Sequence, residues 1–155
     1  MNHKIQFGII GFGHIGTRHA QCIMDHPRAQ LSAICDISPK SKIECEDIYK
    51  SIFCSYENLL VDHSIDVVNI CTPNYLHANM AIDVLKSGKH VVIEKPMALS
   101  GVDAQKIIDT SKSENRLVFC VMQNRFSPSI IWLKEIIFKK KLGQINMVSI
   151  HCFWN

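Results

Sequence analysis

The chain has 155 residues, of which 47% are hydrophobic and 20% charged, and its formal net charge is +3. This size and composition are typical of a single globular domain with a substantial core, and they exclude a disordered segment. The charge is too small to predict binding to nucleic acid or to a membrane surface. No apolar run approaches the roughly 18 residues that a membrane helix needs.

The cysteines and histidines show no spacing typical of a metal site or a disulfide framework. Seven cysteines are scattered without a Cys-x-x-Cys pair, and eight histidines include no His-Glu-x-x-His motif. We therefore expect buried free thiols and no metal. The N-terminal residues lead straight into an apolar run, so we expect no secretory signal. These features favour a reducing cytoplasm as the compartment.

Strand-like and helix-like segments alternate along the chain. Strands are expected at 4–10, 30–35, 52–54, 66–71, 90–94, 117–121 and 145–153. Helices are expected at 15–25, 39–49, 57–61, 75–87, 101–114 and 128–141. This alternation predicts a doubly wound α/β fold, a parallel sheet with right-handed crossovers and helices on both faces. Ser100-x-x-Asp103 resembles a capping box, and Gly88 and Gly143 suit left-handed positions at helix ends.

The most informative motif follows the first strand. Residues 11–16 read Gly-Phe-Gly-His-Ile-Gly, a helix-like stretch follows, and the next strand ends in Asp36. This order of strand, glycine turn, helix, strand and acid is typical of a dinucleotide-binding fingerprint. The pyrophosphate is expected on the free N–H groups at the start of the helix. The alternative is an ordinary structural glycine turn.

Asp36 predicts which dinucleotide binds. Its carboxylate is placed to accept hydrogen bonds from the adenine ribose hydroxyls, and it would repel a 2′-phosphate. NAD is therefore favoured over NADP, although Lys40 and Lys42 could soften that preference. The alternative is that Asp36 caps a helix or a turn.

Two later loops also follow apolar strands. Thr72, Asn74 and His77 come after the strand at 66–71, and such loops are where ligands bind in parallel sheets. Asn74 can equally be a helix cap and His77 a packing histidine. Glu94-Lys95-Pro96 follows the strand at 90–94. The positive charge of an oxidised nicotinamide would lower the pKa of Lys95, so this lysine is a candidate proton acceptor or substrate-orienting group. The alternative is a surface salt bridge.

The end of the chain reads as the start of a further element. The apolar run from Ile145 to Trp154 predicts a strand that is either an edge strand of this sheet or the opening of a second domain. We favour the second reading, in which the chain is a fragment. The domains are then expected at 1–122, the NAD-binding Rossmann domain, and 123–155, a junction helix and the first strand of a missing second domain.

Three motifs together carry a family resemblance. Gly-Phe-Gly-His-Ile-Gly-Thr-Arg-His, Cys-Thr-Pro-Asn-Tyr-Leu-His and Gly-Lys-His-Val-Val-Ile-Glu-Lys-Pro occur in that order, followed by Gln-Asn-Arg-Phe-Ser-Pro at 123–128. The chain closely resembles the glucose-fructose oxidoreductase / inositol dehydrogenase (Gfo/Idh/MocA) family over nearly its whole length. The resemblance implies a Rossmann domain followed by an α/β substrate domain. It also implies reversible hydride transfer between nicotinamide and a secondary alcohol of a sugar, cyclitol or nucleotide sugar.

The resemblance further implies roles for individual residues. The cofactor-binding residues would be Gly11, Phe12, Gly13, His14, Ile15, Gly16, Asp36, Thr72, Asn74, His77, Glu94 and Gln123. Lys95 would contact the substrate and act as the catalytic group, and Arg125 would bind substrate near the domain junction. Within the family, the chain looks similar to the branch acting on UDP-linked amino sugars or their uronic acids.

The main departure from the family is length. Members usually run to roughly twice this size, and their second domain supplies a histidine, often with an aspartate, that shares proton transfer with the lysine. The isolated chain is therefore expected to bind cofactor but to be inactive, and the full-length protein is expected to be a homo-oligomer. Alternatives are a dinucleotide-binding module without turnover and an NADPH-dependent reductase of the same family.

Overall fold

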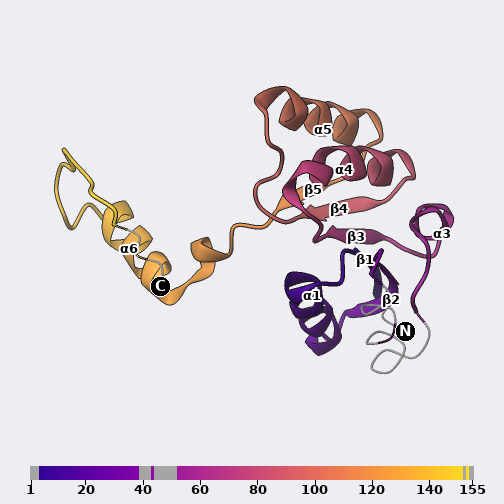
Figure 1. Ribbon diagram of the computed structural model, residues 1–155. Helices are drawn as coiled ribbons and strands as arrows, with labels where there is room; N and C mark the ends of the chain where they lie inside the picture. The colour runs from indigo at the N-terminus through magenta and orange to yellow at the C-terminus, as the bar shows by residue number, and fades with distance from the viewer. Residues whose placement is uncertain (1–3, 39–42, 44–51, 152, 154–155) are drawn as a thin grey trace. The chain divides into compact units, whose positions relative to one another are not determined.

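The computed structural model describes residues 4–38, 43, 52–151 and 153. The chain divides into two units, Met1–Val121 and Met122–Asn155. The first unit contains the sheet and its covering helices, and the second contains two short helical segments (Figure 1).

A five-stranded parallel sheet forms the centre of the first unit. Its strands are β1 (Ile5–Ile10), β2 (Ala29–Cys35), β3 (Val67–Ile70), β4 (His90–Ile93) and β5 (Val118–Cys120). They lie in the order β2-β1-β3-β4-β5, and every neighbouring pair is parallel. The chain thus moves outward from β1 to β2 and then returns to the other side of β1, which makes the β1/β3 boundary the topological switch point.

The predicted strand at 52–54 is reduced to a single bridge. Phe53 pairs in parallel with Ile34 of β2, and Ile34 N–H donates to the Ile52 carbonyl at 2.8 Å. The opposite edge of β2 pairs with β1. The bridge therefore occupies the place of an outer strand, and with it the order corresponds to the six-stranded 3-2-1-4-5-6 arrangement of a Rossmann sheet. The predicted fold class, a doubly wound parallel sheet, is confirmed.

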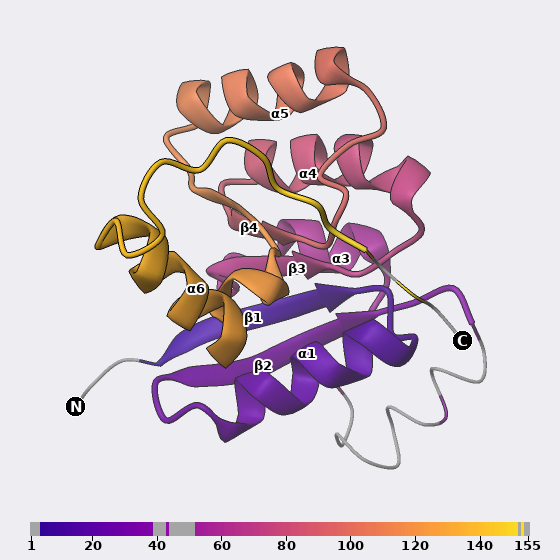
Figure 2. The same cartoon turned by 90° about the vertical axis from the view of Figure 1, so that its left-hand side faces the viewer.

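Helices cover both faces of the sheet. Figures 1 and 2 show α1 (His14–Asp25) on one face and α4 (His77–Lys86) and α5 (Gly101–Ser113) on the other. The short helices α3 (Tyr56–Val61) and η1 (Asn74–Leu76) precede β3 and α4, respectively. This division follows from right-handed crossovers, because a connection that runs in the opposite direction along the sheet places its helix on the opposite face.

The alternation of side chains along the strands divides the core into two layers. On β1, Ile9 packs with Ala20 and Ile23 of α1, whereas its neighbour Ile10 packs in the cluster that contains Leu85 and Ile107 of the other face. Successive residues of a strand point to opposite faces, so both must be apolar where both faces are covered. The uninterrupted apolar runs in the sequence are the consequence.

Most local signals at helix ends act as expected. The Ser100 hydroxyl oxygen accepts from Asp103 N–H at 3.0 Å at the start of α5, and the Ser100 hydroxyl donates to the Asp103 carboxylate at 2.8 Å. Gly88, directly after the C-cap of α4, has φ of +81°, the left-handed conformation that ends a helix without a Cβ penalty. Gly143 also has a positive φ, +65°, but α6 ends at Phe138, and the left-handed residue after its C-cap is Lys140, with φ of +51°.

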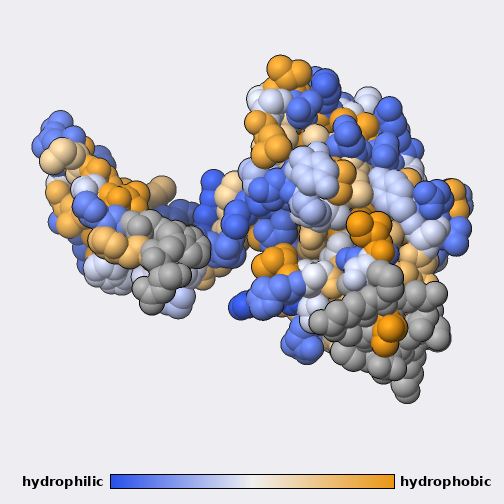
Figure 3. All heavy atoms as spheres, viewed as in Figure 1, coloured by the Kyte–Doolittle hydropathy of each residue, from blue (hydrophilic) through white to orange (hydrophobic). Residues whose placement is uncertain are grey.

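The second unit contains η2 (Gln123–Phe126) and α6 (Pro128–Phe138). Apolar side chains such as Trp132 and Phe138 are exposed on α6, whose surface is coloured in part as hydrophobic in Figure 3. The predicted strand at 145–153 is wrong for the described residues: 145–151 and 153 form no strand, because an extended segment becomes a strand only with a hydrogen-bonded neighbour. The predicted helix at 39–49 lies outside the described residues except at Ile43.

Within the described part of the chain, every helix is too short or too polar to cross a membrane.

Candidate functional site

The candidate site lies at the carboxyl-terminal edge of the sheet. Because all five strands are parallel, the loops that follow them meet at this edge. A cavity of about 350 Å³ opens there. Its lining comes from the ends of β1, β2 and β3 and from α3, η1 and α4, namely Ile10, Gly11, Gly13, Cys35, Asp36, Ile37, Tyr56, Cys71, Thr72, Pro73, Tyr75, Leu76 and Met80.

The three glycines of the fingerprint differ in what surrounds them. Gly11 has φ of +90°, and a Cβ there would lie 2.7 Å from the Cys71 carbonyl oxygen. At Gly16 a Cβ would lie 2.0 Å from the Gly11 carbonyl oxygen, so the first turn of α1 packs directly on the preceding loop. At Gly13 nothing lies within 4 Å. Two glycines therefore permit close backbone packing, and the third leaves open space beside the cavity.

The start of α1 is a favourable place for an anion. Gly13 is the N-cap and has no side chain to cap the helix, so the first N–H groups of α1, at His14 and Ile15, face outward without an intrahelical partner. The helix dipole adds partial positive charge at this end. A pyrophosphate fits this arrangement, because the space at Gly13 lets it approach those N–H groups.

Asp36 is held in place by two backbone groups. Phe12 N–H donates to Oδ2 at 2.5 Å, and Ser38 N–H donates to Oδ1 at 2.7 Å. The first bond ties the end of β2 to the glycine loop. It also occupies the Phe12 N–H, so the groups available to a phosphate begin after Gly13. Lys40 and Lys42 lie outside the described residues.

The loop after β3 separates the three residues predicted there. Thr72 lines the cavity, and Asn74 is exposed at the start of η1. His77 has no exposed surface, and its ring nitrogens lie 2.7 Å from the Pro96 carbonyl oxygen and 2.9 Å from the Thr72 carbonyl oxygen. In this conformation the imidazole does not reach the cavity. The packing alternative describes His77 better than the expected cofactor contact.

Glu94 and Lys95 follow β4 at the same edge of the sheet. Glu94 N–H donates to the Ile70 carbonyl at 3.0 Å, which continues the pairing of β4 with β3. The Glu94 side chain is half-buried, and its Oε1 lies 3.1 Å from His19 Nε2 on α1. Lys95 is exposed. The structure thus brings an exposed lysine to the edge of the sheet that holds the glycine loop.

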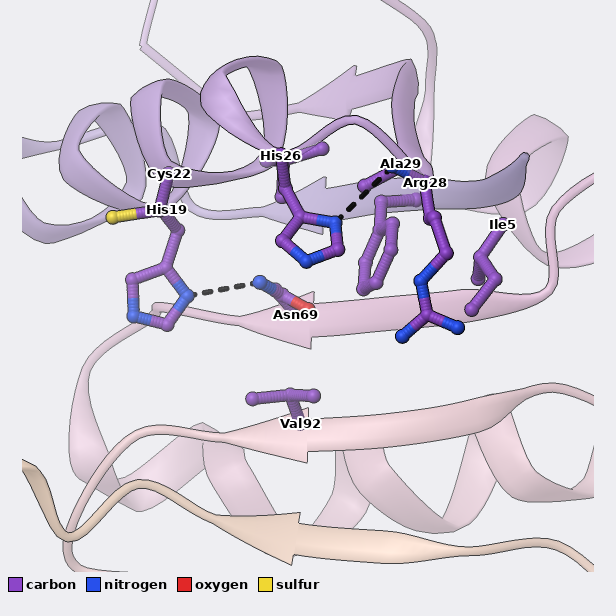
Figure 4. A pocket seen from close by; sticks show the side chains of 10 residues that line it. Ile5, His19, Cys22, His26, Arg28, Ala29, Asn69 and Val92 are labelled. Carbon is purple, nitrogen blue, oxygen red and sulfur yellow. Dashed lines mark hydrogen bonds between the residues drawn. The ribbon is translucent and has the colours of Figure 1, made fainter.

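His19 and its neighbour Asn69 were not predicted as site residues. His19 belongs to the Gly-Phe-Gly-His-Ile-Gly-Thr-Arg-His motif, three residues after Gly16, but spacing alone does not reveal a partner 75 residues away. Its Nδ1 lies 2.9 Å from the amide nitrogen of Asn69, as the dashed line in Figure 4 shows. The sequence did contain a signal for Asn69. Side chains alternate between the two faces of β3, which places this polar residue in the buried face that α1 covers.

Two cysteines line the cavity. Burial raises the pKa of the Cys35 thiol to about 12, with smaller contributions from Cys54 and Asp36, and burial with the charge of Glu94 raises that of Cys71 to about 12. Both thiols therefore stay protonated near neutral pH, which makes them poor nucleophiles and metal ligands. Among the described residues, no group of three or more histidines, cysteines and acids is arranged to hold a metal ion.

Gln123 and Arg125 belong to η2 in the second unit, where both are exposed. Their predicted roles beside the nicotinamide and the substrate stay predictions. The predicted boundary between domains 1–122 and 123–155 also stays a prediction.

A second cavity, of about 390 Å³, lies on the α1 face of the sheet (Figure 4). Its lining includes apolar residues such as Ile5, Phe7 and Val92. The side chains of His19, His26 and Arg28 also line it, as Figure 4 shows. It contains none of the glycine loop, so it is separate from the candidate site at the carboxyl-terminal edge.

Sequence comparison identifies the family. Residues 5–122 match the family GFO_IDH_MocA, described as an oxidoreductase family with an NAD-binding Rossmann fold. The myo-inositol 2-dehydrogenase of Thermotoga maritima is 30% identical over 152 residues, which are 94% of this chain and 44% of that protein. The inositol 2-dehydrogenase of Salmonella typhimurium is also 30% identical, over 154 residues, 93% of this chain and 44% of that protein. The chain thus spans less than half the length of these relatives.

Solved structures agree with this match. The WlbA dehydrogenase of Bordetella pertussis, solved with NADH and UDP-GlcNAcA, superposes with a TM-score of 0.86 at 33% identity, covering 91% of this chain and 44% of that one. An NAD-binding protein of Listeria innocua gives a TM-score of 0.86 at 30% identity, covering 91% and 42%. With the fold, the glycine loop and Asp36 in place, the chain belongs to the Gfo/Idh/MocA oxidoreductase family and carries its NAD-binding Rossmann domain.

Proposed function

We propose that this chain is the cofactor-binding part of an NAD-dependent dehydrogenase acting on a secondary alcohol of a sugar, cyclitol or nucleotide sugar. One observation carries the proposal: the glycine loop, Asp36 and the exposed amine of Lys95 all stand at the carboxyl-terminal edge of one parallel sheet. A pure binding module has no need of an acid–base group beside the dinucleotide.

The relatives support the choice of substrate class. Inositol 2-dehydrogenases and a dehydrogenase solved with NADH and UDP-GlcNAcA are among the proteins similar to this chain. Cyclitols and sugars share the same reacting unit, a ring carbon that bears a hydroxyl. Because the chain spans about 44% of these proteins, the residues that choose between such substrates are expected in the part that it does not match.

Each part of the site has a proposed task. The backbone from Gly11 to Ile15 would hold the pyrophosphate, and Asp36 would accept from the ribose hydroxyls. Thr72, Asn74 and Glu94 would border the cofactor further along the edge. The nicotinamide, when bound, accepts or returns the hydride.

Lys95 would manage the proton of the substrate hydroxyl. Its amine takes that proton when the alcohol becomes a carbonyl and returns it in the reverse direction. The family resemblance further suggests a cofactor contact for Gln123 and a substrate contact for Arg125.

Calorimetric titration of this chain with NAD, NADH and NADP tests the cofactor half of the proposal. We expect NAD and NADH to bind and NADP to bind at least roughly tenfold more weakly, because its 2′-phosphate would meet the Asp36 carboxylate. Tighter binding of NADP would overturn the role of Asp36. No binding of any dinucleotide would reject the chain as a competent cofactor domain.

A further inference from the structure

The turn formed by Glu94, Lys95 and Pro96 is held from both faces of the sheet by histidines. His19 reaches it from α1, on one face, and His77 reaches it from the first residue of α4, on the other. One histidine contacts the residue before Lys95 and the other contacts the residue after it. Lys95 itself stays exposed between these two fixed points.

The contacts of His19 define which of its nitrogens carries the proton. The Asn69 amide N–H donates to Nδ1, so Nδ1 is the acceptor and the proton is on Nε2. Nε2–H then donates to the Glu94 carboxylate at 3.1 Å. The other oxygen of that carboxylate accepts from Lys95 N–H at 3.1 Å. A continuous chain of hydrogen bonds thus runs from β3 through His19 to the backbone of Lys95. Figure 4 shows its first bond, between Asn69 and His19.

Asn69 supports a dedicated role for this chain of bonds. It is 5% exposed in the middle strand of the sheet, and its Oδ1 is without a hydrogen-bond partner among the described residues. A buried amide that is only partly satisfied is costly compared with an apolar residue, and the neighbouring Val68 and Ile70 are apolar. Its one hydrogen bond to a side chain is the bond that orients His19.

His77 differs, because both of its partners are carbonyl oxygens. The Pro96 and Thr72 carbonyls only accept, so each contact needs a ring N–H as its donor. These contacts join the loop after β3 to the turn after β4.

We propose that His19 and His77 are positioning residues that fix the turn around Lys95 from opposite faces and so place its amine beside the nicotinamide. The inference rests on the proposed role of Lys95. A lysine side chain is long and flexible, so a defined position of its amine requires at least a fixed backbone on both sides. Neither histidine touches the reacting atoms; each acts through the turn.

Lysine acylation with acetic anhydride, read by mass spectrometry, measures the position of Lys95 in this chain. In the native chain we expect bound NADH to slow acylation of Lys95 by roughly tenfold. The charged amine would have to give up a contact with the cofactor before it reacts, and one such contact corresponds to about a tenfold change. Lys106 and Lys112 on α5 serve as internal controls whose acylation stays unchanged. In His19→Ala and His77→Ala we expect the protection of Lys95 to disappear while NADH still binds.

Conservative variants separate positioning from loss of structure. Glutamine offers an amide N–H donor and a carbonyl acceptor on separate atoms, the combination that His19 uses, so His19→Gln restores protection. His77→Gln does not restore protection, because its amide oxygen would face one of the two carbonyl oxygens, and neither oxygen can donate a hydrogen bond. His26→Ala, a change in a third histidine that lines the cavity of Figure 4 but does not contact the turn, leaves protection intact.

Imidazole ¹⁵N NMR spectroscopy of the unmodified chain adds a test that needs neither a variant nor the cofactor. We expect the His19 proton on Nε2, with Nδ1 as the acceptor. A proton on Nδ1 of His19, or protection of Lys95 that persists in both alanine variants, would overturn the inference. Failure of the unmodified chain to bind NADH would instead reject the proposed function, while the NMR result still decides the tautomer of His19.

Discussion

At the scale of single residues, the glycine fingerprint offers a matched pair of substitutions. Gly16→Ala would place a Cβ 2.0 Å from the Gly11 carbonyl oxygen, so α1 must shift from the loop. We expect a loss of about 1–3 kcal/mol in the free energy of unfolding, the usual cost of overpacking. Gly13→Ala meets nothing within 4 Å and should leave stability nearly unchanged.

For cofactor binding, Gly13→Ala is the variant with the direct effect. The alanine methyl at position 13 would occupy the space through which the pyrophosphate reaches the helix, so NADH should bind more weakly to Gly13→Ala although its fold is intact. Chemical denaturation and NADH fluorescence measure the two effects separately. Equal stability of the two variants would contradict the packing assigned to Gly16. Gly101→Ala, also in open space and at the start of α5, is the control for both.

Asp36 gives a second prediction at this scale. Asp36→Asn keeps an oxygen to accept from Phe12 N–H but removes the negative charge. We expect NAD to bind roughly tenfold more weakly, because hydrogen bonds to a charged acceptor are worth about 1.5–3 kcal/mol. NADP should lose less affinity or gain some, since the repulsion of its 2′-phosphate is gone.

The ratio of the two dissociation constants, measured by calorimetry, checks this prediction. Asp109→Asn, a change on the exposed face of α5, controls for the general loss of one negative charge. An unchanged ratio in Asp36→Asn would mean that the carboxylate serves only the turn at Phe12 and Ser38.

At the scale of elements, a buried lysine links the end of α3 to the start of β4. Lys89 is 1% exposed, and its Nζ donates to the Leu60 carbonyl at 2.7 Å. Burial lowers the pKa of Lys89 below the ordinary lysine value of 10.5, and nearby Asp62 opposes that shift only in part. The bond satisfies a carbonyl at the end of α3 that has no partner further along the helix.

This shift predicts how stability depends on pH. Between the lowered pKa of the folded state and the ordinary pKa of the unfolded state, the unfolded chain binds more protons, so stability rises with pH there. Lys89→Met should remove that rise. Unfolding by urea at a series of alkaline pH values measures it, with Lys86→Met, on the exposed side of α4, as the control. Parallel pH profiles for Lys89→Met and the unmodified chain would contradict the prediction.

The elements of the sheet could be predicted because their signals are local. Buried parallel strands are apolar on both faces, and the runs ending at Ile10, Cys35 and Ile70 show this without reference to the rest of the chain. The strand expected at 145–153 shows the limit of such signals. Its residues favour an extended backbone, but a strand also needs a neighbour, and local sequence does not say whether one is present.

At the scale of the whole molecule, the candidate site was predictable in position but not in detail. Glycines and acids at strand ends indicate the carboxyl-terminal edge, since topology brings those ends together. The contacts of His19 with Glu94 and of His77 with Pro96 join residues 75 and 19 positions apart across opposite faces of the sheet. Such pairs depend on tertiary packing, which no local pattern contains.

The parallel sheet predicts that the cofactor stabilises the first unit unevenly. A ligand at 100 times its dissociation constant adds about 2.7 kcal/mol to the free energy of unfolding. A local opening that leaves the bound site intact is not stabilised by the ligand. Hydrogen exchange should therefore slow most at the carboxyl-terminal edge. We expect NADH to protect amides in 11–17, 36–38, 71–77 and 94–97.

The opposite edge of the same sheet is the internal control. Loops 62–66, 87–89 and 115–117 precede β3, β4 and β5 and lie at the amino-terminal ends of these strands. Hydrogen exchange with mass spectrometry, with and without NADH, compares the two edges in one sample. Equal protection at both edges would indicate global stabilisation alone, and protection confined to the amino-terminal edge would place the cofactor away from the glycine loop. Protection of 94–97 together with 11–17, while the loops at the amino-terminal edge exchange as before, is the result that links Lys95 to the bound dinucleotide, because global stabilisation would slow exchange at both edges.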